Sequence, residues 1–176
     1  MTDRPGARQA GRRLSLLRHA KSSWKDASLD DIDRPLAPRG KRAAKKMARH
    51  VRGMDVSPEL ILCSPARRTR ETLDAILPKL AEGTDVRIEP ELYGASVMEL
   101  LSLLRRTPDP VRSLMVVGHN PGLQELAIEL ARDPGGPLAA KFPTGALAAF
   151  GVPGSWKELG PDRVELLDFV VPRDLG

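Results

Sequence analysis

Short apolar runs in this chain end abruptly in polar or charged residues, and the pattern occurs three times. The runs cover residues 14–17, 60–63 and 114–117. Each is short, nearly continuous in its apolar character and bounded by polar residues, which is typical of a buried strand in a parallel sheet. The pattern therefore predicts three central strands that carry polar side chains at their ends.

Segments with helical periodicity follow these runs. Residues 38–51 place apolar side chains at helical spacing, and Ala37 leaves that helix without the usual side-chain N-cap. Ser64 and Pro65 favour a second helix, with serine as N-cap and proline at its first position. The buried stripe predicted for that helix consists of Leu73, Ile76, Leu77 and Leu80.

Further along the chain, Ser96 and Glu99 have the spacing of a capping box that opens a third helix. Pro121 and Gly122 open a fourth. Further strands are expected at residues 86–89, 145–152 and 163–171. This alternation predicts an α/β fold with three α/β/α layers and a mostly parallel central sheet. We expect one domain over residues 14–176, preceded by a flexible polar leader over residues 1–13.

The three central strands deliver basic and imidazole side chains to one place. Arg18 and His19 follow the first strand, Arg68 lies shortly after the second, and His119 follows the third. Ligands of open α/β sheets bind outside the carboxyl ends of the strands, and no acidic residue directly follows any of these three. Two imidazoles beside guanidinium groups favour a phosphoryl ligand.

These residues also carry a resemblance to a known family. The stretches RHAKSSW, DRPLAPRG, SPARRTRET and VGHNPGLQEL resemble motifs of the histidine phosphatase superfamily, and in particular of its small SixA-like phosphohistidine phosphatases. The resemblance extends from about Leu14 to Leu175. It implies a phosphoglycerate-mutase-like fold without a large cap insertion, and catalysis without a metal or other cofactor. It also implies that Arg34 lies beside the bound phosphate and that Arg68 clamps it.

The implied chemistry is covalent phosphoryl transfer. Neutral His19 attacks phosphorus, and water then hydrolyses the phosphohistidine intermediate. Arg18, Arg68, His119 and Arg34 hold the phosphoryl oxygens. We expect the arginines to keep His19 neutral, and a bound dianion to favour protonated His119.

One position departs from the superfamily pattern. The mutases and many ester phosphatases of the superfamily carry a general acid two residues after the leucine that matches Leu92, whereas this chain has Gly94. An alkoxide leaves poorly without a proton, but imidazole, with a reference pKa of about 6.5, leaves readily. The departure favours a phosphohistidine as the substrate, and the small frame without a cap insertion favours one that is borne on a protein. A phosphatase for small phosphate esters and a non-catalytic phosphoprotein-binding module remain as alternatives.

Composition excludes several other classes. No run of about 18 apolar residues suggests a membrane span, and no apolar segment suggests a secretory signal, so we expect a cytoplasmic protein. The lone Cys63 excludes an internal disulfide and is expected to be a buried apolar residue. Dispersed aspartates in residues 21–36 do not form a calcium loop. We interpret them as solvated charges, or as a carboxylate that positions an arginine.

Charge is distributed unevenly along the chain. The net charge is +5 and the isoelectric point is about 9.7, but aromatic residues make up only 3%. Few stacking platforms and no nucleic-acid-binding motif argue against a nucleic-acid partner. No acidic residue occurs in residues 34–52. This basic stretch fits either an acidic or phosphorylated partner or a merely solvated helix face.

Overall fold

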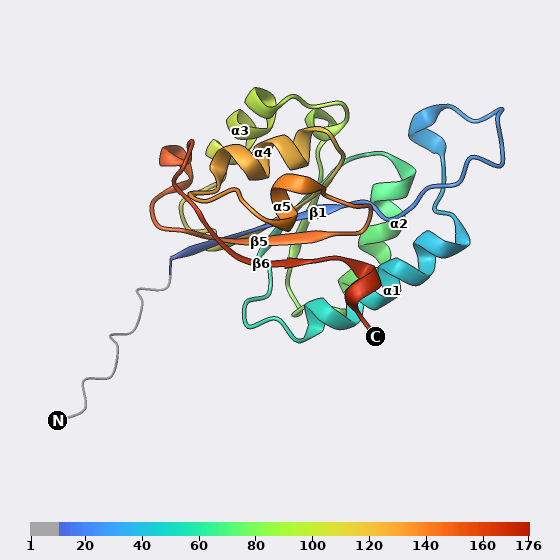
Figure 1. Cartoon of the computed structure of the whole chain (residues 1–176), viewed down its shortest axis with the longest axis horizontal. Helices are drawn as coiled ribbons and strands as arrows, with labels where there is room; N and C mark the ends of the chain where they lie inside the picture. Colours follow the sequence, from blue (N-terminus) through green and yellow to red (C-terminus); the bar gives the residue numbers. More distant parts are fainter. Residues whose placement is uncertain (1–10) are drawn as a thin grey trace.

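A six-stranded sheet with helices on both faces organises the chain (Figure 1). The computed structural model describes residues 11–176. The strands lie in the order β3-β2-β4-β1-β5-β6, and only β5 runs against the others. The strands are β1 (Arg12–Arg18), β2 (Leu60–Cys63), β3 (Asp85–Ile88), β4 (Ser113–Gly118), β5 (Leu147–Val152) and β6 (Glu165–Val170). The sheet is therefore mostly parallel, as predicted.

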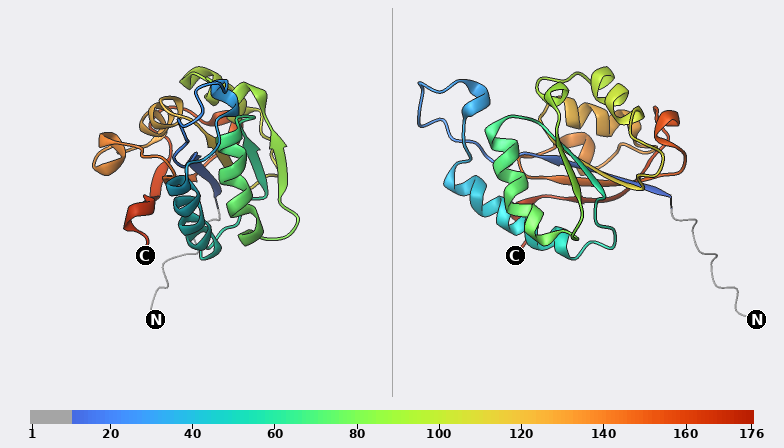
Figure 2. Two further views of the ribbon diagram at one scale, coloured as in Figure 1. Left: turned by 90° about the vertical axis from the view of Figure 1, so that its right-hand side faces the viewer. Right: turned by 180° about the vertical axis from the view of Figure 1, so that it is seen from behind.

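The α-helices form two layers on either side of this sheet, and short 3-10 turns occur in the connections. The α-helices are α1 (Pro38–Arg52), α2 (Arg67–Ile76), α3 (Val97–Arg105), α4 (Gly122–Leu130) and α5 (Pro137–Ala140). The 3-10 turns are η1 (Asp31–Asp33), η2 (Leu77–Lys79), η3 (Pro90–Leu92), η4 (Trp156–Glu158) and η5 (Pro172–Asp174). Figure 2 shows α1 and α2 on one side of the sheet and α3 and α4 on the other.

Alternation along the central strands fills both layers of the core. In β1, Leu14 and Leu16 pack into the cluster that contains α3 and α4, whereas Leu17 packs into the cluster with α1 and α2. In β4, Val116 and Val117 divide in the same way. Since successive side chains of a strand point to opposite faces, nearly continuous apolar runs are what a sheet covered on both faces requires.

The strand register brings the three predicted strand ends together. β4 lies between β2 and β1, with Val117 opposite both Leu17 and Cys63. The backbone N–H of His19 donates to the carbonyl of Gly118 at 3.1 Å. All three strands thus end at the same level, which the chain order alone does not require.

A long loop after β1 projects beyond this end of the sheet (Figures 1 and 2). It returns so that the first turn of α1 packs against the residues that follow β1. Ala37 N–H donates to the Lys21 carbonyl at 2.9 Å, and a Cβ on Gly40 would lie 2.0 Å from that same oxygen. Only glycine allows this approach. The start of α1 is therefore fixed next to the strand end that carries His19.

Several sequence predictions need correction. Ser64 and Pro65 do not begin α2, because the helix begins at Arg67 and has Ala66 at its N-cap position. Leu77 is exposed instead of lining the buried stripe, because the helix ends at Ile76 and a 3-10 turn containing Pro78 follows. The capping box of Ser96 and Glu99 and the uncapped start of α1 at Ala37 are confirmed.

The first strand is also longer than predicted. β1 begins at Arg12 instead of residue 14, so the last two residues of the predicted leader belong to the sheet. Arg12 donates to the Gly154 carbonyl at 2.9 Å. The remainder of the predicted leader, residues 1–10, lies outside the described residues. Within residues 11–176, none of the helices combines the length and apolar character that a bilayer crossing requires.

Candidate active site

His19 lies immediately after β1 and is 7% exposed. Its Nδ1 is 2.7 Å from the carbonyl oxygen of Ala20. Because a carbonyl oxygen can only accept, Nδ1 carries the ring proton, and the lone pair of the neutral ring is on Nε2. Ala20 is held in turn by its own N–H, which donates to Thr72 Oγ1 at 3.0 Å. The backbone thus fixes both the orientation and the tautomer of this imidazole.

Three arginines surround this ring. The charges of Arg68, Arg18 and Arg34 all act on His19, and each comes from a different part of the chain. Arg18 ends β1 and donates to the Phe142 carbonyl at 3.0 Å. Arg68 is in the first turn of α2, while Arg34 is in the long loop. The structure therefore brings together the arginines that the sequence predicted.

His119 follows β4 and faces His19, with the two ring centroids 5.2 Å apart. Its Nε2 is 2.7 Å from the Ser64 hydroxyl. Its Nδ1 is buried and has no hydrogen-bond partner in the structure, and the same is true of Arg18 Nε. Buried polar groups normally have partners. Two such groups in one site are suited to a polar ligand.

Both imidazoles are neutral at ordinary pH. Burial is the largest cause that lowers the pKa of His19 to about 4; the charges of the three arginines contribute to this lowering, and the hydrogen bond to Ala20 opposes it. Burial also lowers the pKa of His119 to about 3, with contributions from His19 and Arg68. The predicted neutrality of His19 is therefore supported, although burial exceeds the arginines as its cause.

The site also contains an acidic residue, Asp31, which comes from the long loop and not from a strand end. Asp31 Oδ2 accepts from Arg68 Nη2 at 3.0 Å, and Asp31 Oδ1 accepts from Arg34 Nη1 at 2.9 Å. The Tyr93 hydroxyl also donates to Asp31 Oδ2. These hydrogen bonds, with that of Tyr93 the largest cause, lower the pKa of Asp31 to about 2. Asp31 is thus ionised and bridges two of the arginines.

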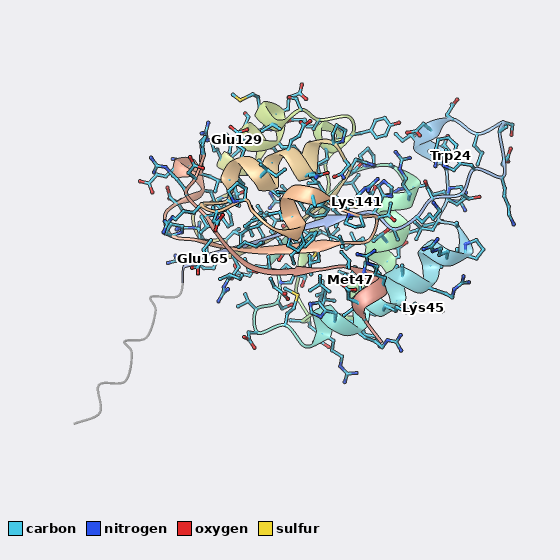
Figure 3. The ribbon with its side chains drawn as sticks, in the orientation of Figure 1. Trp24, Lys45, Met47, Glu129, Lys141 and Glu165 are labelled. Atoms are coloured by element: carbon cyan, nitrogen blue, oxygen red, sulfur yellow. The ribbon has the colours of Figure 1, made fainter. Side chains whose placement is uncertain are left out.

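Arg34 is held by the loop residues that directly follow His19. It donates to the Ser23 carbonyl at 3.1 Å and to the Ser22 hydroxyl. Its guanidinium carbon lies 3.2 Å from the ring centroid of Trp24, an arrangement that favours a cation. Figure 3 shows Trp24 on the outer part of this loop. Although Arg34 comes from a loop, it is only 7% exposed.

A pocket of about 240 Å³ is lined in part by His119. Its walls include Gly94, Ala95 and Glu125. Gly94 has a φ of +72°, and a Cβ there would meet no atom within 4 Å. The space that a general acid at position 94 would use is therefore open. Glu91, the acid closest in sequence, instead forms an exposed ion pair with Arg106.

Sequence reasoning found the four groups at the strand ends but missed their partners. Asp31 was one of several dispersed aspartates, and Tyr93 had no motif around it. Ser64 was interpreted as a helix cap, whereas its hydroxyl contacts His119. The pairing of Asp31 with an arginine was one of two expectations for that loop. Cys63 is buried, as predicted, and burial raises the pKa of its thiol to about 12, so it is protonated.

Metal ligands do not gather at this site. Within residues 11–176, no group of three or more histidine, cysteine, aspartate or glutamate side chains is arranged to hold a metal ion. The arrangement found instead is three guanidinium groups and two neutral imidazoles with one carboxylate. Its net charge is positive, and it can bind and orient an anion through charge-assisted hydrogen bonds.

Comparison with known proteins decides the family. The family model of the histidine phosphatase superfamily, branch 1, matches residues 14–105, which contain His19, Arg34 and Arg68. The chain belongs to the histidine phosphatase superfamily. This phosphatase is 30% identical to the phosphohistidine phosphatase SixA of Escherichia coli over 136 residues, covering 76% of this chain and 81% of that protein.

Two further relatives cover almost the whole phosphatase. An uncharacterized protein of Mycobacterium tuberculosis is 38% identical over 165 residues, which is 89% of this chain and all of that protein. The solved structure of a SixA protein from Nakamurella multipartitia is 32% identical, with a TM-score of 0.80 over 91% of this chain and 95% of that one. The phosphatase is thus SixA-like and has the phosphoglycerate-mutase-like fold.

The two buried histidines make the stability of the phosphatase depend on pH. The unfolded chain binds protons at both rings below about pH 6.5, whereas the folded chain binds them only near pH 4 and pH 3. The contribution of the two neutral histidines to the free energy of unfolding is therefore fully present above pH 6.5 and is lost as the pH decreases towards 4. At pH 5.5 we expect a loss of about 1.4 kcal/mol per histidine.

Urea unfolding between pH 7.5 and pH 5 measures this effect. The double variant His19→Asn, His119→Asn is expected to show a flatter pH dependence, whatever its absolute stability. Titration of the imidazole resonances by NMR gives a direct check. If both rings gain protons near pH 6.5, the burial argument is wrong.

Proposed function

We propose that residues 12–176 form a single histidine phosphatase domain that hydrolyses phosphohistidine on a protein, through a covalent intermediate on His19. The observation that carries the proposal is the tautomer of His19. Its Nδ1 proton is committed to the Ala20 carbonyl, so the Nε2 lone pair is free and lies among three arginines. A neutral nitrogen nucleophile beside cationic groups is the requirement for attack on an anionic phosphoryl group.

In the first step, His19 Nε2 forms a bond to phosphorus while the bond between phosphorus and the substrate imidazole breaks. The leaving nitrogen keeps the electron pair. If the other nitrogen of that imidazole already carries a proton, the ring departs as neutral imidazole and needs no proton from the enzyme. The guanidinium groups of Arg18, Arg68 and Arg34 stabilise the charge on the three equatorial oxygens.

In the second step, water attacks the phosphorus of the intermediate. The bond to His19 breaks, its electron pair returns to Nε2, and the phosphoryl group leaves with the water oxygen as dihydrogen phosphate. His119 Nδ1 is buried without a partner and is suited to hold a phosphoryl oxygen once a dianion raises its pKa. The step regenerates neutral His19 with its Nδ1 proton in place.

An activity on small phosphate esters is the second candidate. The observation that favours it is Glu125, an acidic residue that lines the same pocket as His119. As a general acid it would protonate an alkoxide leaving group. The two candidates share the nucleophile and the arginines, but they differ in whether turnover needs this carboxyl group.

Phosphate release from a histidine-phosphorylated protein and from a panel of sugar phosphates tests the assignment, with wild type and Glu125→Gln compared. We expect faster release from phosphohistidine and less than a threefold change in the variant. Loss of a proton donor needed for an alkoxide would cost roughly 10²- to 10⁴-fold. A preference for an ester that collapses in Glu125→Gln would transfer the assignment to ester hydrolysis.

A further inference from the structure

The positive charge of this chain is concentrated in a single helix. α1 contains seven of the 28 lysine and arginine residues and none of the 23 acidic ones. The rest of the chain, with 21 basic and 23 acidic residues, has a net charge of −2. The excess of +5 therefore comes from α1 alone.

Most of these charges are free at the surface. Six of the seven cationic side chains are exposed, and within residues 11–176 none of the six has a carboxylate within 4.0 Å. The six are Arg39, Lys41, Arg42, Lys45, Arg49 and Arg52. Two nearby acids contact other residues instead: Glu71 of α2 pairs with Arg67 at 3.3 Å, and Asp168 of β6 lies 3.5 Å from His50 of α1.

This arrangement opposes helix stability. Lys41, Lys45 and Arg49 are spaced four residues apart, and like charges at that spacing destabilise a helix. The first turn contains Arg39 and Lys41 and no acidic residue, although the helix dipole favours negative charge there. A face that served only solubility would mix both signs. Proteins usually depart from such rules of helix stability where the residues serve a function.

The basic face begins at the rim of the active site. The backbone of Lys21, two residues after His19, contacts Ala37 and Gly40 at the start of α1. Arg34 is four residues before the helix. The exposed cations therefore continue outward from the residues that surround His19, and Figure 3 shows Lys45 on the outer side of the helix.

We infer that the exposed face of α1 is the docking surface for an acidic protein surface that surrounds the phosphorylated histidine of the substrate. This inference rests on the proposed function. Its partner chemistry follows from charge complementarity, since cationic surfaces accelerate encounter with acidic partners. The apolar face of α1, which includes Met47 and Val51, is buried in the core. The exposed face has no aromatic side chain, so neither membrane insertion nor base stacking is supported.

Two triple variants test the inference, and each of them removes three positive charges. Lys41→Gln, Lys45→Gln, Arg49→Gln neutralises the basic face and keeps good helix formers. Arg132→Gln, Lys157→Gln, Arg163→Gln is the control, because these exposed residues lie near the ends of α4 and β5, at the opposite end of the sheet. Thermal unfolding should show that both variants are folded.

Binding is measured in the His19→Ala background by fluorescence anisotropy, with an acidic protein domain phosphorylated on histidine as the probe. We expect the α1 triple variant to weaken binding about tenfold at low salt and to reduce the salt dependence. The control triple variant should stay within twofold. In the background with intact His19, the α1 variant should hydrolyse free phosphohistidine within twofold of wild type.

Equal weakening by both triple variants would overturn the inference, because net charge alone would then explain binding. Tighter binding to a DNA duplex or to phosphatidylserine vesicles than to the acidic domain, lost in the α1 variant, would assign the face to those partners instead. If wild type releases no phosphate from phosphohistidine, the proposed function fails. The anisotropy measurement still decides whether α1 binds the acidic domain.

Discussion

Replacing His19 with alanine is expected to reduce phosphate release from phosphohistidine by roughly 10⁴-fold or more, because the variant lacks the nucleophile and with it the covalent route. His119 faces the same space, but its Nε2 is engaged with the Ser64 hydroxyl. The wild type mixed with substrate should also show a phosphate adduct on residue 19 by mass spectrometry, and the variant should show none.

His50 provides a matched control for this experiment. It is the third of the three histidines in the chain and lies near the end of α1, where it faces Asp168 on β6. His50→Ala is therefore expected to keep turnover within twofold. If His19→Ala retained substantial release while His119→Ala abolished it, the nucleophile would have to be reassigned to His119.

The second large effect is expected for Arg68→Lys, which should lower kcat/KM by about 10²- to 10³-fold even though the positive charge is kept. Arg68 uses two guanidinium nitrogens at once, towards the Asp31 carbonyl at 2.7 Å and towards its carboxylate at 3.0 Å. A lysine ammonium is a point charge that cannot reproduce this planar, two-pronged geometry. The fall should appear mainly in kcat, because the arginine stabilises charge that develops during transfer.

Arg67→Lys is the matched control for Arg68→Lys. Arg67 precedes Arg68 in α2, but its side chain is exposed and pairs with Glu71 at 3.3 Å. Exposed pairs of this kind contribute about 0–1 kcal/mol to stability, so turnover should stay within twofold of wild type. Equal, small effects at both positions would remove Arg68 from the proposed mechanism.

Asp31 explains why the arginines are ordered before any anion binds. Three cations near one another repel. Burial lowers the pKa of Arg18, and the charge of Arg68 lowers it further, so both disfavour the charged form of this arginine. Asp31 neutralises part of that charge while its side chain remains half exposed. A phosphoryl group can therefore replace a carboxylate as the partner of Arg68 and Arg34, which favours a site that is organised in advance.

The sequence by itself determined the elements and the residues at their ends. Nearly continuous apolar runs predicted strands covered on both faces, because such runs bury side chains on both sides of a sheet. Residues directly after those strands could then be assigned to one edge, which identified His19, Arg68 and His119 without coordinates. Local backbone chemistry was also readable, as the Ser96 capping box shows.

Only the tertiary structure decided how these groups are partnered. Asp31 reaches Arg68 across 37 positions, and Tyr93 reaches Asp31 across 62. Such contacts depend on how the long loop after β1 folds back towards the strand ends, and local sequence patterns do not encode that path. The predicted start of α2 was wrong for a related reason. Ser64 has a local capping pattern, but its hydroxyl hydrogen-bonds His119, which follows the neighbouring strand. The low pKa values of the histidines likewise required burial, because desolvation depends on everything packed around a group and not on its neighbours in the chain.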